Sequence, residues 1–97
     1  MIKHIVMWRI KDENKAENAL KIKHDLEALT DKIDVLRFAE VGVNIQKSDA
    51  AYDAVLTTEF ANSADLDTYQ NHPDHLVVKK FIGSIAVARA VVDYEMQ

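Results

Sequence analysis

The sequence contains no cysteine, one proline and two glycines among its 97 residues. Without cysteine, disulfide bonds, thiolate nucleophiles and zinc–thiolate sites are excluded, and the stability of the fold must come from packing. The scarcity of proline and glycine argues against linkers and low-complexity segments. At this length we expect a single domain that spans residues 1–97.

Basic residues are also fewer than acidic residues. Lysine and arginine number 12 against 16 acidic residues, which gives a net charge of −4, and no run of basic residues occurs. Phosphate binding needs a clustered basic surface, so the sequence predicts no nucleic-acid partner. The apolar stretch Met1–Ile10 is too short to span a bilayer and lacks the cleavage site of a secretory signal. We therefore expect a cytoplasmic protein with no membrane partner.

Hydrophobic periodicity predicts six segments of regular structure. Alternation with a period of two predicts strands over residues 2–11, 35–46, 52–60 and 85–95. Spacings of three and four residues predict a first helix from Asp12 to Ile33 and a second, in two halves, from Asn62 to Gly83. The order βαββαβ predicts an α+β, ferredoxin-like fold with one antiparallel sheet. Helices would cover only one face of that sheet.

The other face of the sheet is expected to be apolar. We expect it to show Val6, Trp8, Val55, Val87 and Val91, an area too contiguous for a monomer of this size. The simplest solution is a homodimer in which two sheets meet face to face, as in a dimeric α/β barrel. Polar residues of that face would then pair with one another or line a cavity, and they are His4, Asp53, Thr57, Glu59 and Arg89.

The segment Tyr69–His75 places a phenol and two imidazoles around the only proline. Pro73 suits the first position of a helix and forces His72 to be extended, so we expect His72 to cap that helix. His75 then lies in the first turn, where the helix dipole favours the neutral imidazole of a general base, whereas Asp74 acts in the opposite direction. From spacing alone, Tyr69 is expected to pack in the core and the histidines to be polar loop residues. With no third ligand at a zinc spacing, no metal site is predicted.

Several segments, in order along nearly the full length, resemble the stress-responsive A/B barrel (Dabb) family. They are the opening Met1–Trp8, Glu40–Asn44, Tyr52–Leu56, and Tyr69-x-x-His-Pro-x-His75 followed by Val78-x-x-Phe-Ile82. The resemblance implies a ferredoxin-like protomer that forms a dimeric α+β barrel.

The sequence is also similar to one plant branch of this family, the polyketide cyclases. The resemblance assigns the catalytic base to His75 and its partner to Tyr69, and it makes His4 a cavity residue. We also expect Trp8 and His72 to contact a ligand. An intramolecular aldol condensation needs a base and a donor for the developing enolate, with no metal or other cofactor. Trp8 departs from that branch because it is bulky where a long alkyl tail would need room. By fold analogy alone, related monooxygenase-like barrels imply cofactor-free oxygenation of an aromatic compound.

Besides a metal-binding barrel, in which His72 and His75 would share an ion with a carboxylate, two hypotheses on function remain open from the sequence. The first is a homodimeric stress-responsive barrel protein that binds or converts a small organic molecule by cofactor-free, cyclase-like acid/base chemistry. The second is a non-catalytic, stress-related or structural dimer with no substrate, in which the His-Pro motif only caps a helix. Convergence of His4, Tyr69 and His75 on an open cavity would favour the first, and a barrel filled by Trp8 would favour the second.

Overall fold

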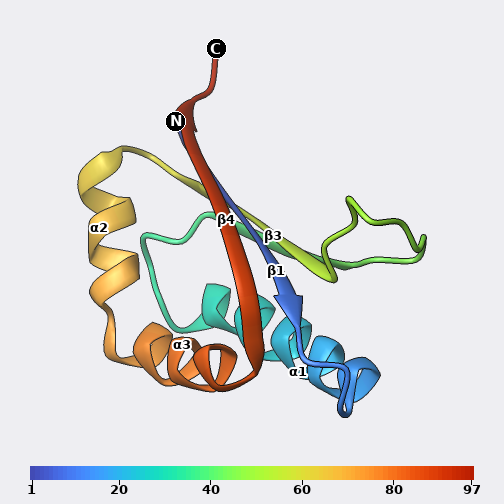
Figure 1. The fold of residues 1–97 in the computed structure, drawn as a ribbon. Helices are drawn as coiled ribbons and strands as arrows, with labels where there is room; N and C mark the ends of the chain where they lie inside the picture. Colours follow the sequence, from blue (N-terminus) through green and yellow to red (C-terminus); the bar gives the residue numbers. More distant parts are fainter.

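The computed structural model describes residues 1–97 as one four-stranded sheet with helices on one side (Figure 1). All neighbouring strands are antiparallel, and their spatial order is β2-β3-β1-β4. This is the predicted ferredoxin-like arrangement. None of the helices has the length and apolar character that crossing a membrane requires. The elements in chain order are β1 (Ile2–Ile10), α1 (Lys15–Glu27), a 3₁₀ helix (Ala28–Asp31), β2 (Phe38–Val43), β3 (Ala54–Phe60), α2 (Ser63–Asn71), α3 (Pro73–Ile85) and β4 (Ala86–Glu95).

Three helix boundaries differ from those expected. The first helix is predicted to run to Ile33, but α1 ends at Glu27 and a 3₁₀ helix follows it to Asp31. The N-cap of α1 is Asn14, not Asp12, and Asn14 adopts a left-handed conformation with φ of 56° that asparagine tolerates better than most residues. Gly83 does not end α3, which continues to Ile85, because this glycine lacks the positive φ of a glycine C-cap. The predicted apolar stripe of the first helix is confirmed, since all five of its residues are buried: Ala19, Ile22, Leu26, Leu29 and Ile33.

The junction between α2 and α3 follows the predicted capping pattern. Asn62 Oδ1 accepts a hydrogen bond of 2.8 Å from the Asp65 amide at the start of α2. His72 is extended, and its Nδ1 accepts one of 3.1 Å from the Asp74 amide, so its expected N-cap role is confirmed. Pro73 is the first residue of α3. Because the proline breaks the helix, α2 and α3 meet at a corner beside the sheet (Figure 1).

The sheet face that packs against the helices, termed the covered face, carries the even-numbered residues of β1. Trp8 is only 5% exposed there, so the prediction that Trp8 and Val6 lie on the uncovered side is wrong. Strand β1 is apolar on both sides, and alternation separates the two sets of residues without telling which set meets the helices. The buried residues of this face in β1 and β3 are Ile2, His4, Val6, Trp8, Ile10, Ala54, Leu56, Thr58 and Phe60.

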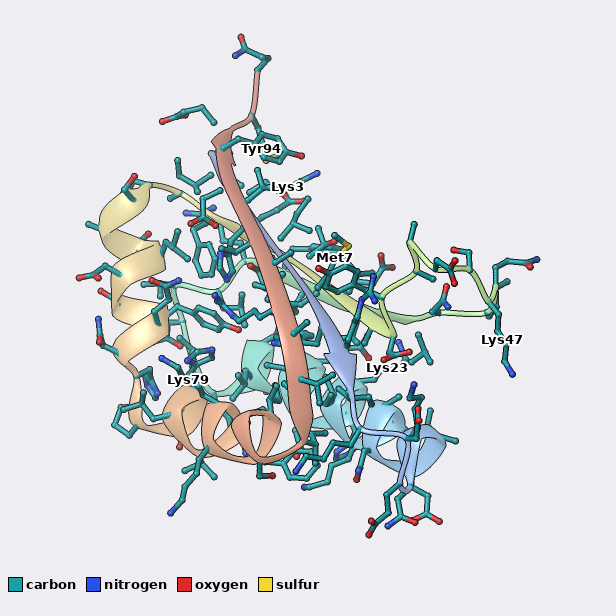
Figure 2. All side chains as sticks on the ribbon, in the orientation of Figure 1. Lys3, Met7, Lys23, Lys47, Lys79 and Tyr94 are labelled. Carbon is teal, nitrogen blue, oxygen red and sulfur yellow. The ribbon has the colours of Figure 1, made fainter.

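The opposite side, termed the uncovered face, has no helix over it. Figure 2 shows Lys3, Met7 and Tyr94 on the side of β1 and β4 away from the helices. Strand register places Thr57 and Glu59 here, as predicted, and Glu59 lies 3.9 Å from the Lys3 ammonium. The apolar residues of the uncovered face are Ile5, Met7, Phe38, Val55, Val92 and Tyr94.

Five other residues expected on the uncovered face lie elsewhere. His4 belongs to the covered face, where it is buried. Val91 and Arg89 pair with Val6 and Trp8, and therefore belong to the helix side of the edge strand β4. Val87 lies where the register between β1 and β4 shifts. Asp53 precedes β3 and has a structural role, because its Oδ2 accepts a hydrogen bond of 2.8 Å from the Ile10 amide.

Candidate functional site

A cavity of about 310 Å³ lies between the covered face and the helices. Trp8 and Leu56 belong to its apolar floor, whereas His75 and Lys79 of α3 and Arg89 of β4 line it from the sides. The expectation of a cavity between two sheets is therefore corrected: this cavity lies within one protomer. Its other lining residues are His4, Val6, Leu26, Asp67, Gln70, Asn71 and Ile82.

A second hollow, of about 500 Å³, lies beside the β2–β3 hairpin and is mostly apolar. Its polar side chains are Asn44 and Tyr52, and it contains no imidazole. General acid/base chemistry depends most often on histidine. Because His4 and His75 both line the smaller cavity, we place the candidate site there.

His75 has the environment of a neutral base. Its Nδ1 lies 3.2 Å from the Gln70 carbonyl oxygen, to which the Nδ1–H can donate. That tautomer leaves the lone pair on Nε2. Burial lowers the pKa of His75, and the nearby positive charges of Lys79 and Arg89 lower it further. The imidazole is therefore held in the form that accepts a proton.

Tyr69 lies behind His75 rather than in the lining of the cavity. It is fully buried, which confirms the expected core position. Its ring centroid lies 4.4 Å from that of His75 and 5.0 Å from that of Phe60. The buried hydroxyl has no hydrogen-bond partner, and burial raises the pKa of Tyr69 well above its ordinary value. The phenol therefore keeps its proton at neutral pH.

His4 reaches the same cavity from the centre of the sheet. It is buried, and its Nδ1 pairs with the carboxylate of Asp93, its cross-strand partner on β4. Thr58 donates a hydrogen bond of 3.0 Å to the His4 carbonyl oxygen. The Asp93 contact orients the imidazole, and the Thr58 contact fixes the backbone of β1 at this position. His72, in contrast, does not line the cavity, and its ring nitrogen is engaged by the helix that it caps.

The cavity contains polar residues that the sequence did not single out. Four of its lining residues are spaced four positions apart in the sequence: Asp67, Asn71, His75 and Lys79. Spacing of four places residues on one helix face, which was a usable signal. The proline between α2 and α3 concealed it, because the series crosses two helices rather than one. Arg89 also lines the cavity, although the sequence predicts it on the other face of the sheet.

Comparison with known proteins matches nearly the whole chain to one family. Residues 2–96 match the model of the Stress Responsive A/B Barrel Domain, Dabb. A curated relative, a stress-response A/B barrel domain-containing protein of Arabidopsis thaliana, is 30% identical over 95 residues, which is 97% of this chain. The chain spans only 36% of the length of that relative.

Solved structures share the fold. A dimeric protein of unknown function with a ferredoxin-like fold from Bacteroides fragilis is 35% identical, with a TM-score of 0.89 over 98% of this chain and 95% of that one. The hydroxynitrile lyase of Passiflora edulis has a TM-score of 0.86 at 17% identity, over 99% of this chain and 93% of the lyase, and that likeness concerns the fold alone. On the match over residues 2–96, the chain belongs to the stress-responsive A/B barrel domain family.

Proposed function

We propose that this protein is a homodimeric barrel protein that binds a small organic molecule in the His4–His75 cavity and transfers a proton through His75. The observation that carries this proposal is the state of His75. Its Nδ1 faces the Gln70 carbonyl oxygen, burial lowers its pKa, and its side chain lines a cavity large enough for a small ligand. A neutral imidazole in a concave site is the minimum that a general base requires.

The chemistry that suits this arrangement is removal of a proton from a carbon next to a carbonyl group. Nε2 of His75 accepts the proton, and the negative charge that develops on the carbonyl oxygen needs donors. The side-chain amide of Gln70 and the cations Lys79 and Arg89 line the same cavity and can supply them, whereas the Asn71 amide already donates to Asp67. Tyr69 lies outside the cavity lining, and its proposed role as partner of His75 is to support the imidazole through ring contact.

The fold is compatible with such an activity. The Passiflora edulis protein of the same fold is named as a lyase that acts on hydroxynitriles, so this architecture supports small-molecule chemistry in at least one case. At 17% identity the likeness does not transfer that substrate. The proposal for this chain therefore rests on its own imidazoles.

The homodimer is proposed from the uncovered face. Val92 and Tyr94 of β4 and Phe38 of β2 are exposed there beside half-buried Ile5 and Val55. Contiguous apolar surface of this kind marks an interaction site on a small protein. The Bacteroides fragilis relative, 35% identical, is described as dimeric. A second copy that presents the same face would cover it through a twofold interface.

The test is deuterium exchange at the benzylic carbon next to the carbonyl group of a small ketone with one aromatic ring, phenylacetone, followed by proton NMR in D₂O. Wild-type protein should accelerate the exchange over buffer, and His75→Ala should reduce that acceleration by about 100-fold or more, the usual contribution of a general base. His24→Ala is the matched control, because His24 is an exposed histidine outside the cavity. Equal exchange in wild type and His75→Ala would contradict the proposal.

A non-catalytic dimer is the second candidate, and one observation favours it. His72 of the His-Pro motif is fully accounted for by helix capping, since its ring accepts the Asp74 amide hydrogen. If wild-type protein gave no exchange above buffer with phenylacetone while remaining dimeric, the structural alternative would be favoured.

A further inference from the structure

The net charge of the cavity lining has the opposite sign to the net charge of the whole protein. The chain has a net charge of −4, yet the cavity is lined by Lys79 and Arg89 against a single acid, Asp67. A further carboxylate nearby, that of Asp93, is already paired with His4. With neutral His75, the lining therefore carries an excess of one positive charge.

Most other lysines of the ordered helices and strands have carboxylate partners. Lys15, Lys21 and Lys23 of α1 lie 3.0 Å, 2.7 Å and 2.7 Å from carboxylate oxygens. Lys79 and Arg89 make no ion pair within 4.0 Å, although they come from different elements and line one cavity. Both also lower the pKa of His75, as positive charges do when they lie close to an imidazole. The two cations thus converge on the cavity from α3 and from β4.

Apolar and cationic groups occupy different parts of the cavity. Lys79 and Arg89 are exposed, so they form its rim, whereas Val6, Trp8 and Leu56 are buried at its floor. Figure 2 shows Lys79 near the corner between α2 and α3, on the helix side of β4. A ligand that satisfied both parts would have a negatively charged end and a compact apolar end.

We propose that the cavity binds a small aromatic carboxylate, with the carboxylate between Arg89 and Lys79 and the ring on the floor formed by Val6, Trp8 and Leu56. The volume of about 310 Å³ limits the ligand to one ring with short substituents. Arginine suits this role because its planar guanidinium binds a carboxylate through two parallel hydrogen bonds. The inference rests on the proposed function in that it names the ligand class of the same cavity.

The test compares benzoate with benzamide, which has nearly the same shape and no charge. Binding is measured by isothermal titration calorimetry and by the fluorescence of Trp8, the only tryptophan and a residue of the cavity floor. Wild-type protein should bind benzoate at least tenfold more tightly than benzamide. Arg89→Gln and Lys79→Gln should each weaken benzoate binding severalfold and leave benzamide binding unchanged. NMR titration of His75 should show its pKa rising when benzoate binds, because the anion offsets the two cations.

Lys47→Gln is the matched control, since it removes the same charge at the far tip of the β2–β3 hairpin (Figure 2). Equal binding of benzoate and benzamide, or an equal loss of benzoate binding in Lys47→Gln and Arg89→Gln, would overturn the anion site. Absence of benzoate binding to a wild-type protein that still exchanges phenylacetone would also overturn it, while leaving His75 as base. Benzoate binding that depends on Arg89, in a protein without exchange, would support the anion site and remove the catalytic part of the proposed function.

Discussion

The two faces of the sheet are similarly apolar in the sequence but differ in the folded chain. On the covered face, His4, Val6 and Trp8 are buried under helices and still leave a cavity with ionisable groups around it. On the uncovered face, Ile5, Met7 and Val92 form an apolar surface without imidazoles. Under the proposed function, one face of each strand would serve chemistry and the other would serve association. Substitutions on either face therefore probe separate properties.

The largest effect is expected from a charge on the uncovered face. Val92→Asp should weaken the dimer by about 100-fold or more, because each protomer would bury an unpaired carboxylate at the interface. Val92 is 62% exposed in the protomer, so folding itself should be nearly unaffected. Sedimentation equilibrium of the variant and of wild-type protein gives the two dissociation constants.

Val77→Asp provides the control for this substitution. Val77 is 72% exposed on α3, on the helix side of the sheet. Its substitution should leave the dimer intact. Dissociation by both variants, or by neither, would remove the uncovered face as the interface.

The helix layer that packs on the covered face should respond to removal of one oxygen atom from Tyr69 of α2. Tyr69→Phe deletes a buried hydroxyl that has no hydrogen-bond partner, so the free energy of unfolding should rise by about 1 kcal/mol. Tyr94→Phe is the counterpart on the uncovered face, where the side chain is 43% exposed in the protomer, and its effect on stability should be smaller. Urea denaturation measures both. Lower stability of Tyr69→Phe would mean that the hydroxyl is satisfied in solution.

The two glycines give a smaller contrast. Gly83 in α3 has open space around the position of an added Cβ and no positive φ, so Gly83→Ala should stabilise the protein by about 0.5 to 1 kcal/mol. A Cβ on Gly42 would lie 3.2 Å from Cγ1 of Val55 on the uncovered face. That approach is too close for ordinary packing, so Gly42→Ala should give no gain. Equal gains in thermal stability for both variants would show that β2 and β3 adjust easily at the Gly42–Val55 pair.

The smallest effect is a pH dependence from His75. Its folded pKa lies below the ordinary value of 6.5, so the unfolded chain binds the proton first as the pH falls. The contribution of neutral His75 to the free energy of unfolding is therefore fully present above about pH 7. It is lost as the pH falls below about 6.5, until the imidazole of the folded protein is protonated as well. The free energy of unfolding, measured by urea denaturation between pH 5 and 8, should therefore fall toward acid. This dependence should be weaker in His75→Gln than in wild type or His24→Gln, and an unchanged slope would contradict it.

Much of the fold could be predicted because its signals are local. Alternation in β1 and the stripe from Ala19 to Ile33 identify a strand and a helix without knowledge of the rest. The His72-Pro73 step identifies the break between α2 and α3 on steric grounds. The order of these elements then leads to the observed sheet.

The assignment of faces, and with it most of the site, could not be predicted in the same way. Trp8 and Met7 are neighbours on opposite faces, and both are apolar, so periodicity cannot tell which one the helices bury. That choice depends on contacts between elements far apart in the chain. Arg89 joins His75 in one cavity only because β4 pairs with β1 in a particular register. The ligand roles inferred for His4 and Trp8, and the catalytic roles of His75 and Tyr69, stay predictions.

The central position of β1 has a consequence for how the protein folds. This first strand pairs with β3 on one side and with β4, the last strand, on the other. His4 and Asp93, which meet across that last pairing, are 89 positions apart. Closing so long a loop is slow, and during synthesis β1 cannot pair with β4 until β4 has been made. The wall of the cavity that contains Arg89 is therefore among the last parts to form, and a ligand held there would favour completion of the sheet.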